Sequence, residues 1–398
     1  MIKKKILFVI PNLGAGGAEK SLVNLLNTFD PERYTVDLFL FSHSGLFFDQ
    51  IPKFVNILPL NKTMVIFQKS LKNSLLEFIR RKQFGLAFNR ITFALLHRIV
   101  RNGSYAEQYA WKYLSESIDN LPVIYDSAVA FLEKSSIYFT VEKVLADKKI
   151  GWVHNDYNKL RLNKNFDHFY FKNLTYLVTV SEECKDVLLK EFPDLKDKVN
   201  VIYNINSSLL IKKLSDVDSF IYKLKPNFIS IGRLHPQKGF DLAIEAAKIL
   251  KSWGIYFNWY VIGEGSERAK LEGLIDKYEL KNQFHLLGMK QNPYAYLKNA
   301  DIFLQTSLYE GKSIAVDEAK ILGKPIILTN FSTAKDQIIH EYNGIICEMT
   351  AEGIALAIVK YLENSELKNK IINNLKFDTS GTEGEIKKLY RLIENQIV

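Results

Sequence analysis

The sequence is poor in cysteine and has no long apolar segment. Its two cysteines, Cys184 and Cys347, form no disulfide or metal-binding pattern and are typical of a reducing cytoplasm. The longest stretches without a charged residue, 6–18 and 199–211, contain 13 residues each. Because a membrane-spanning helix needs about 20 apolar residues, we expect no transmembrane segment. The seven histidines include no HExxH motif and no close pair, so we expect no metal site.

The amino-terminal segment lacks the composition of a signal peptide. Its lysines precede only five apolar residues, at 6–10, whereas the apolar region of a signal peptide has about 7–15. These residues instead predict a first β-strand that is buried on both faces. Apolar residues make up 47% of the chain and charged residues 24%, which is typical of a soluble globular protein and argues against disorder. At roughly 100–200 residues per domain, the 398 residues predict two or three domains.

Positive charge is concentrated in one segment. The formal net charge is +9, and residues 62–101 contain nine Lys and Arg against one acidic residue, Glu77. The rest of the chain is nearly balanced, with 44 basic and 43 acidic residues. The charge excess therefore marks one candidate surface for an acidic partner rather than a property of the whole molecule.

The same segment has helical periodicity. Over 84–101, five apolar residues fall on one helix face: Phe84, Phe88, Ile91, Leu95 and Ile99. Bases including Arg90 and Arg101 lie on roughly the opposite side. We predict a basic amphipathic helix that binds an anionic membrane or a lipid diphosphate. The bases assigned to this role are Arg80, Arg81, Lys82 and Arg90. In the alternative interpretation, the apolar stripe is part of the core and the bases are a solvated face.

Short apolar runs alternate with helical patterns along most of the chain, which predicts an α/β fold with mainly parallel strands. The predicted strands are 6–10, 36–41, 123–131, 174–180, 227–231, 259–262, 284–287, 302–305 and 326–329. They form two series, separated by a polar stretch at 204–226 that we interpret as a linker. We therefore predict two doubly wound, Rossmann-like domains with a cleft between them.

A glycine-containing turn at 14–17 follows the first predicted strand and precedes a helical pattern. Backbone amides at such a helix start can receive a phosphate, although a tight turn explains the glycines equally well. A dinucleotide-binding GxGxxG pattern would require glycine at position 19. Because Glu19 is there instead, the dehydrogenase interpretation is weakened.

Two cations follow the first strand of the second series. Arg233 and Lys238 are placed at the carboxyl end of strand 227–231, where open α/β sheets bind ligands. Arginine offers a planar fork of donors and lysine a point charge, which together suit a diphosphate. The alternative is a pair of solvated loop cations, which the bracketing Gly232 and Gly239 make less favourable because they permit close backbone approach.

Two glutamates, Glu310 and Glu318, bracket a GKS sequence after strand 302–305. If a helix begins near Ser313, both carboxylates could hydrogen-bond different hydroxyls of one ligand, or they could be surface acids near a helix start. The GKS is not the end of a P-loop, because Thr306 occupies the position where that motif requires glycine.

Two other polar features remain ambiguous by themselves. His154 follows an apolar stretch that ends at Ile150, and it is either a structural hydrogen-bonding group or a polar group in the cleft. Asp216 and Asp218 have the DxD form that holds a metal–nucleotide complex in one class of sugar transferases. No recognisable strand end precedes them, which favours a solvated acidic pair.

Taken together, these segments resemble glycosyltransferase family 4, the retaining, metal-independent branch of the GT-B fold, of the bacterial surface-polysaccharide type. The resemblance covers nearly the whole chain and depends on the order and spacing of its motifs. These are GGAE at 16–19, WVHND at 152–156, VSEECKD at 180–186, GRLHPQKGFDLAIEA at 232–246, VIGEGSE at 261–267, LLGMKQN at 286–292, and the glutamates at 310 and 318.

The resemblance implies a GT-B protein with an acceptor-binding domain at 1–205 and a nucleotide-sugar-binding domain at 206–383. A helix at about 384–398 would pack back on the first domain. The implied catalytic residues are His154, Arg233, Lys238 and Glu310. The implied donor-binding residues are Gly16, Gly17, Gly288, Met289, Lys312, Ser313, Ile314 and Glu318.

Each implied residue has a role towards a nucleoside-diphosphate sugar. Arg233 and Lys238 would neutralise the diphosphate as the sugar bond breaks, without a metal or other cofactor. Glu318 would bind the ribose, Glu310 and His154 the donor sugar, and Gly16 with Gly17 the phosphates. Amides at 312–314 would contact sugar or phosphate, and the backbone at 288–289 the base. EGKS at 310–313 departs from the usual EGFG-type segment, so Lys312 could add charge near a phosphate or an acidic sugar.

We therefore predict a retaining hexosyl-type glycosyltransferase that acts on a lipid-linked glycan acceptor in capsule or exopolysaccharide biosynthesis. It would be cytoplasmic and peripheral on the inner face of the cell membrane. One alternative is a GT-B sugar-nucleotide 2-epimerase, which works on the donor alone. A more distant one is a non-enzymatic protein that binds membrane or nucleic acid, although no nucleic-acid recognition motif accompanies the basic segment.

Overall fold

The computed structural model describes residues 3–14, 16–100, 102–217, 222, 226–290, 292–377 and 381–394. Arg101 of the basic segment and Asp218 of the DxD sequence lie outside these residues. The chain forms two compact units. Unit 1 comprises Met1–Gly14, Ala18–Ile202 and Ile386–Val398, and unit 2 comprises Ala15–Gly17 and Tyr203–Glu385.

Unit 1 is built on a parallel sheet of seven strands in the order β3-β2-β1-β4-β5-β6-β7. The strands are β1 Lys4–Ile10, β2 Tyr34–Leu40, β3 Asn56–Ile57, β4 Ile124–Ala130, β5 Leu145–Val153, β6 Tyr176–Thr179 and β7 Val199–Val201. The helices are α1 Gly17–Thr28, α2 Lys62–Gln68, α3 Leu71–Arg80, α4 Phe84–Ile99, α5 Gly103–Ser115, α6 Ser135–Lys143, α7 Lys164–Lys172, α8 Glu182–Glu191 and α17 Ile386–Glu394. The apolar residues 6–10 of β1 are all fully buried, as expected for a strand covered on both faces.

Unit 2 is built on a second parallel sheet, of six strands in the order β10-β9-β8-β11-β12-β13. Its strands are β8 Asn227–Ile231, β9 Asn258–Ile262, β10 Phe284–Leu286, β11 Ile302–Gln305, β12 Ile326–Thr329 and β13 Ile345–Cys347. Its helices are α9 Ser208–Ser215, α10 Phe240–Ser252, α11 Arg268–Lys277, α12 Tyr294–Asn299, α13 Ile314–Ile321, α14 Ala334–Gln337, α15 Ala351–Glu363 and α16 Ser365–Leu375. The order reverses between β8 and β11, which makes their carboxyl ends the expected ligand-binding edge.

The predicted α/β class is confirmed, with two Rossmann-like sheets and alternating helices. Local expectations were incomplete in several places, and the short strands β3, β7 and β13 were not predicted. The interpreted linker at 204–226 contains a helix, α9, which packs against α12 and α13. Strand β5 was not among the predicted strands, because LADKKIGWV has no regular apolar run even though it pairs with β4 and β6.

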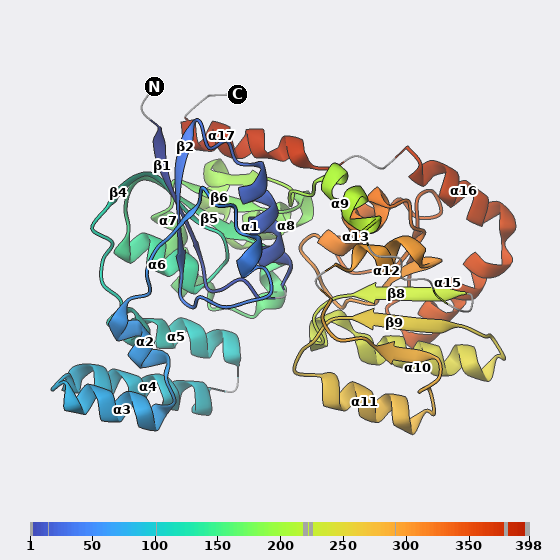
Figure 1. Cartoon of the computed structure of the whole chain (residues 1–398), viewed down its shortest axis with the longest axis horizontal. Helices are drawn as coiled ribbons and strands as arrows, with labels where there is room; N and C mark the ends of the chain where they lie inside the picture. The colour runs from blue at the N-terminus through green and yellow to red at the C-terminus, as the bar shows by residue number, and fades with distance from the viewer. Residues whose placement is uncertain are drawn as a thin grey trace. The chain divides into compact units, whose positions relative to one another are not determined.

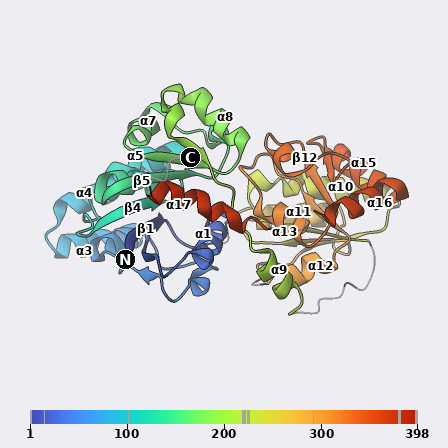
Figure 2. The same cartoon turned by 90° about the horizontal axis from the view of Figure 1, so that it is seen from above.

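Helix α17 belongs to unit 1, although it lies at the other end of the chain from β1 and β2 (Figure 2). The hydroxyl of Tyr390 accepts a hydrogen bond from the backbone N–H of Asp30 at 2.9 Å, and its ring stacks on Tyr34 with centroids 5.0 Å apart. Glu394 accepts hydrogen bonds from Tyr34 and Arg33, both at 2.5 Å. These contacts fasten the helix to the start of β2.

Helices α2–α5 form one block inserted between β3 and β4 (Figure 1). Each helix packs on the next along the chain. Their shared core is small and consists mainly of Ile66, Phe67, Phe78 and Ala87. Because the core of this block is so small, much of the surface of its helices is left uncovered.

Candidate functional site

The candidate site of unit 2 comes from the loops that follow β8 and β11, which are neighbouring parallel strands. Lys238 ends a short 3₁₀ turn after β8, and Glu310 lies in the loop after β11. Nζ of Lys238 is 2.5 Å from Oε1 of Glu310, and both side chains are largely buried. The fold therefore brings together two of the four residues predicted to be catalytic.

Glu310 is fixed by its own loop. The hydroxyl of Ser307 donates to Oε1 at 2.7 Å, and Nε2 of Gln305 donates to the same oxygen at 3.2 Å. The hydroxyl of Thr333 donates to the backbone carbonyl of Glu310 at 3.1 Å. Within the described part of the chain, Oε2 of Glu310 accepts no hydrogen bond. The carboxylate is thus held rigidly through one oxygen, and the other can accept from a ligand.

The loops after β8 and β11 are also joined through their backbones. The N–H of Leu308 donates to the carbonyl of Gln237 at 2.8 Å, and the hydroxyl of Thr306 donates to the carbonyl of Lys238 at 3.0 Å. Gly239 has φ of +59°, and a Cβ there would lie 2.2 Å from the carbonyl oxygen of Thr306. Only glycine permits this approach, so Gly239 helps to place Lys238 beside Glu310.

Helix α13 begins where the sequence predicted, directly after Ser313. The Ser313 amide donates to Oε1 of Gln337 at 2.8 Å, and its hydroxyl donates to Oε1 of Gln305 at 2.7 Å. Gln337 returns a hydrogen bond to the Ser313 carbonyl at 2.7 Å. Ile314, the next residue, is buried. In this structure Ser313 is therefore fully engaged by unit 2 itself, and ligand contacts of the amides at 312–314 stay a prediction.

Glu318 lies about one turn into α13, as expected, and only 1% of it is exposed. Its Oε1 accepts a hydrogen bond at 2.9 Å from the hydroxyl of Tyr294, at the start of α12. A buried carboxylate needs such donors to offset the loss of its hydration. The ribose-binding role of Glu318 stays a prediction.

Lys312 is packed against unit 2 rather than extended into solvent. Its side chain is 10% exposed, and Nζ lies 3.8 Å from the ring centroid of Tyr203 and 4.0 Å from Oδ2 of Asp317. Its backbone carbonyl accepts from Nδ2 of Asn204 at 3.2 Å. This cation therefore has a structural role, as a cation–π and ion-pair partner, that the sequence pattern did not indicate.

Arg233 differs from Lys238 in its exposure and in its ion pairing. It is exposed, and its guanidinium forms no ion pair with any described residue. The neighbouring His235 has a lowered pKa, first because it is partly buried and second because of the positive charge of Arg233. A charged arginine beside a neutral imidazole gives this loop an open cationic group that a diphosphate can pair with.

The base-contact position predicted at 288–289 lies beside β10. Gly288 has φ of +71°, and its carbonyl accepts from the N–H of Gly263 at 3.0 Å. Met289 is 44% exposed. Glu264 and Arg268 form a salt bridge at 2.7 Å close to Gly288. The backbone here is fixed by the loop after β9, with an apolar side chain open to solvent.

In unit 1, His154 directly follows β5 and is buried among the rings of Phe131 and Trp152. Burial lowers its pKa to about 3, so the imidazole is neutral. The backbone of Phe131 acts in the opposite direction and raises this pKa. Nε2 of His154 has no hydrogen-bond partner among the described residues.

Glu133 is a neighbour of His154 that the sequence reasoning missed. It is 6% exposed and follows β4. Its Oε2 accepts from the backbone N–H of His154 at 3.1 Å, and its Oε1 accepts from Nδ2 of Asn155 at 2.9 Å. An acid immediately after the predicted strand 123–131 was the available signal. Other supporting residues missed in unit 2 are Gln305, Ser307, Tyr294, Thr333 and Gln337.

The glycines at 16–17 lie where α1 begins, with Glu19 in its first turn.

No metal-binding group of three or more His, Cys, Asp or Glu occurs in the described residues. None of the described helices is long and apolar enough to cross a bilayer.

The four bases assigned to membrane binding differ in their surroundings. Arg80 and Lys82 are exposed, and Arg81 pairs with Glu77 at 2.9 Å. Arg90 instead lies over the rings of Phe67 and Phe93, at 5.5 and 5.7 Å, and donates to the carbonyl of Lys69 at 3.1 Å. Arg90 thus holds α4 against α2, and burial lowers its pKa.

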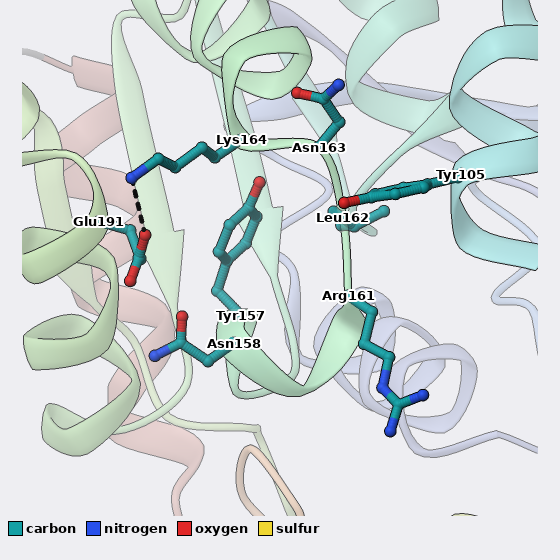
Figure 3. A pocket seen from close by; sticks show the side chains of 8 residues that line it. All are labelled: Tyr105, Tyr157, Asn158, Arg161, Leu162, Asn163, Lys164 and Glu191. Atoms are coloured by element: carbon teal, nitrogen blue, oxygen red, sulfur yellow. Dashed lines mark hydrogen bonds and ion pairs between the residues drawn. The ribbon is translucent and has the colours of Figure 1, made fainter. Parts of the chain in front are cut away.

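A cavity of about 360 Å³ in unit 1 was not anticipated from the sequence (Figure 3). Its lining combines aromatic rings, amides and charges: Tyr105, Tyr157, Asn158, Arg161, Leu162, Asn163, Lys164 and Glu191. Lys164 and Glu191 form an ion pair at 3.4 Å across one side (Figure 3). Rings, amides and cations are the groups that bind sugars and phosphates.

A cavity of about 610 Å³ in unit 2 is lined by residues that include Pro226, Asp301 and Pro325. These residues precede β8, β11 and β12, so this cavity lies at the amino ends of the strands. Ligand sites of open α/β sheets lie at the carboxyl ends instead. The Lys238–Glu310 cluster, not this cavity, occupies the expected edge.

The chain was compared with protein families, with curated proteins and with solved structures. Residues 212–377 match the family model described as Glycosyl transferases group 1. An uncharacterized glycosyltransferase of Methanocaldococcus jannaschii is 30% identical over 182 residues, which are 43% of each chain. An uncharacterized glycosyltransferase of Haemophilus influenzae is 23% identical over 373 residues, 92% of each chain.

A relative with a named activity is the UDP-Gal:alpha-D-GlcNAc-diphosphoundecaprenol alpha-1,3-galactosyltransferase of Escherichia coli. It is 28% identical over 239 residues, which cover 56% of this chain and 61% of that protein. Other relatives are named for the biosynthesis of amylovoran in Erwinia amylovora and of colanic acid in Escherichia coli. The amylovoran protein is 33% identical, over 33% of this chain and 35% of that protein. The colanic acid protein is 32% identical, over 35% of this chain and 37% of that protein.

Among solved structures, Anabaena Alr3699/HepE in complex with UDP and glucose superimposes with a TM-score of 0.69. It is 16% identical, over 99% of this chain and 100% of that chain. The chain has the GT-B fold. Together with the sequence matches, this fold supports placing it with the glycosyltransferases.

Proposed function

We propose that the chain is a retaining, metal-independent glycosyltransferase of family 4 that transfers a hexosyl group from a nucleoside-diphosphate sugar. The observation that carries this proposal is the Lys238–Glu310 pair at the carboxyl ends of β8 and β11. It places a cation and a carboxylate side by side. Among the described residues, one oxygen of that carboxylate accepts no hydrogen bond, and Arg233, on the same loop as Lys238, forms no ion pair. The structural neighbour with bound UDP and glucose supports a donor of this class.

The proposed chemistry needs positive charge more than a base. As the bond between the anomeric carbon and the diphosphate breaks, Arg233 and Lys238 stabilise the charge that develops on the leaving oxygen. Glu310 accepts a hydrogen bond from a donor-sugar hydroxyl through Oε2. The acceptor hydroxyl attacks from the face that the diphosphate leaves, and its proton passes to the departing phosphate oxygen. Attack on that face retains the anomeric configuration.

The proposed acceptor is a glycan on a polyprenyl diphosphate, in capsule or exopolysaccharide assembly. The galactosyltransferase relative acts on a diphosphoundecaprenol-linked sugar, according to its name, which supports this class. The protein would then work as a peripheral protein on the cytoplasmic face of the membrane, where such acceptors are presented. His154, which is neutral and whose Nε2 has no partner among the described residues, would form a hydrogen bond with the donor sugar.

The test is a binding and turnover screen over UDP-, GDP- and dTDP-sugars, followed by product analysis on lipid-diphosphate-linked acceptors. A glycoside with the donor's anomeric configuration, formed equally well with a metal chelator present, is the expected result. An inverted product would contradict retention, and loss of activity with chelator would contradict metal independence. An isomerised sugar formed from donor alone would instead identify the epimerase.

A further inference from the structure

The apolar stripe of α4 faces solvent, which contradicts the interpretation that it belongs to the core. Exposed fractions along the stripe are 64% for Phe84, 65% for Phe88, 40% for Ile91, 48% for Leu95 and 71% for Ile99. The inward side of α4 carries Ala87 and Arg90 instead. Since these five residues are three or four positions apart, they form one continuous apolar strip.

Helix α3, which packs on α4, also exposes apolar side chains. Leu76 and Ile79 are 59% and 53% exposed, whereas Phe78 on the same helix is fully buried. Isolated exposed apolar residues are normal, but seven on two helices that pack together indicate a surface that lipid or another molecule covers. We call this set of seven residues, five on α4 and two on α3, the apolar face.

Unneutralised cations accompany the apolar face. Lys72, Arg80, Lys82 and Arg98 are exposed, and none forms an ion pair within the described part of the chain. The single acid of the segment, Glu77, is shared by Lys69 and Arg81, at 2.5 and 2.9 Å. The surface therefore combines apolar side chains with net positive charge.

We propose that the apolar face docks the protein on an anionic phospholipid bilayer, with the stripe at the headgroup–acyl boundary and the cations among lipid phosphates. An interfacial helix of this kind needs both features, and both are on these two helices. A second copy of this chain is a poorer occupant, because it would bring two positive surfaces together. Nucleic acid offers phosphates but no apolar phase for the two phenylalanines.

This inference deepens the proposed function. The purpose of membrane docking rests on the proposed function, but lipid binding itself does not. A transferase with a lipid-linked acceptor gains from being held at the surface where that acceptor is presented. Lipid binding itself needs no donor and no turnover, so the two proposals can fail separately.

The test is flotation of the full chain with vesicles of phosphatidylglycerol and phosphatidylcholine, compared with pure phosphatidylcholine. Wild type should float with the anionic vesicles. The double substitution Phe84→Asp with Phe88→Asp should lower the partition coefficient roughly tenfold or more. The matched control is Phe169→Asp, on α7 of the same unit, since Phe169 is 62% exposed but lies outside the apolar face. It should float as wild type does.

Charge and insertion are separated by two further measurements. The double variant Arg80→Gln with Lys82→Asn should weaken flotation at low salt, and much less at high salt, where charge is screened. The control variant Lys196→Ser should float as wild type does at both salt concentrations. A tryptophan in the variant Phe88→Trp should be quenched by brominated lipids.

Unchanged melting temperature and donor binding in the Phe84, Phe88 variant would show that the fold and the donor site are intact. Equal flotation of this variant and wild type would overturn the inference. The inference would also be overturned if wild type bound no vesicles and formed a dimer that the substitutions dissociate. Failure to bind any nucleotide sugar, with flotation as expected, would count against the proposed function alone.

Discussion

Lys238 and Glu310 are 72 residues apart in the chain, yet Nζ of one lies 2.5 Å from Oε1 of the other. Two further side chains, Ser307 and Gln305, donate to the same oxygen. Such convergence on one carboxylate oxygen keeps the second oxygen oriented, which is the preorganisation that electrostatic catalysis requires.

Removing the charge of Lys238 should slow transfer far more than it destabilises the fold. We expect Lys238→Met to lower kcat/KM roughly 100–1,000-fold, because one preorganised charge at the leaving group is lost. Steady-state kinetics with the donor identified in the screen would measure it. Lys270→Met is the matched control, since Lys270 is a half-exposed surface cation paired with Glu267 and Asp241. Equal kinetics for both variants would contradict the assigned role.

Gly239 should tolerate alanine poorly for two separable reasons. Its φ is +59°, and a Cβ would meet the Thr306 carbonyl at 2.2 Å. Gly254 has φ of +73° but nothing near its Cβ position. Gly254→Ala should therefore cost only backbone strain, about 1 kcal/mol. Gly239→Ala should cost more than that and should also impair donor binding. Chemical denaturation and donor titration of both variants would measure this, and equal destabilisation would mean that the close approach is unimportant.

Substitution of Lys312 tests whether its side chain binds the donor or stabilises the fold. Its cation–π contact with Tyr203 and its ion pair with Asp317 predict that Lys312→Met lowers the melting temperature. The sequence-based hypothesis predicts a raised donor KM. A variant with lower stability but unchanged KM would assign Lys312 to packing. A variant with raised KM and unchanged stability would assign it to the donor.

His154 should make stability depend on pH. The pKa of the buried imidazole is about 3, below the ordinary value of 6.5, so the unfolded state binds a proton that the folded state does not. Stability due to this residue is therefore present above pH 6.5 and is lost as the pH falls towards 3. Between pH 7 and 5 the loss should be about 2 kcal/mol.

The measurement is urea unfolding of wild type and His154→Asn at pH 7 and pH 5. The asparagine keeps a polar amide at this position but has no group that titrates in this range. The difference in unfolding free energy between the two pH values should therefore be smaller in the variant. An identical pH dependence would mean that His154 is not the titrating group.

The strand series and the basic helix could be predicted because their signals are local. Residues 6–10 are apolar without alternation, and the five stripe residues of α4 repeat at helical spacing, so both elements follow from neighbouring residues alone. The loops at 232–239 and 310–318 could be located because each follows such a strand. Strand β5 could not be delimited, since LADKKIGWV is half polar and is held by pairing with β4 and β6.

The sequence by itself determined most of the strands of both sheets and which loops lie at their carboxyl ends, because periodicity and apolar content are properties of adjacent residues. It also located the charge excess. Only the tertiary structure decided what each side chain meets. Lys312 packs on Tyr203, Glu318 is buried beneath Tyr294, and the stripe of α4 is uncovered. A helical period defines a face but not what covers it, since that depends on residues brought together from distant parts of the chain.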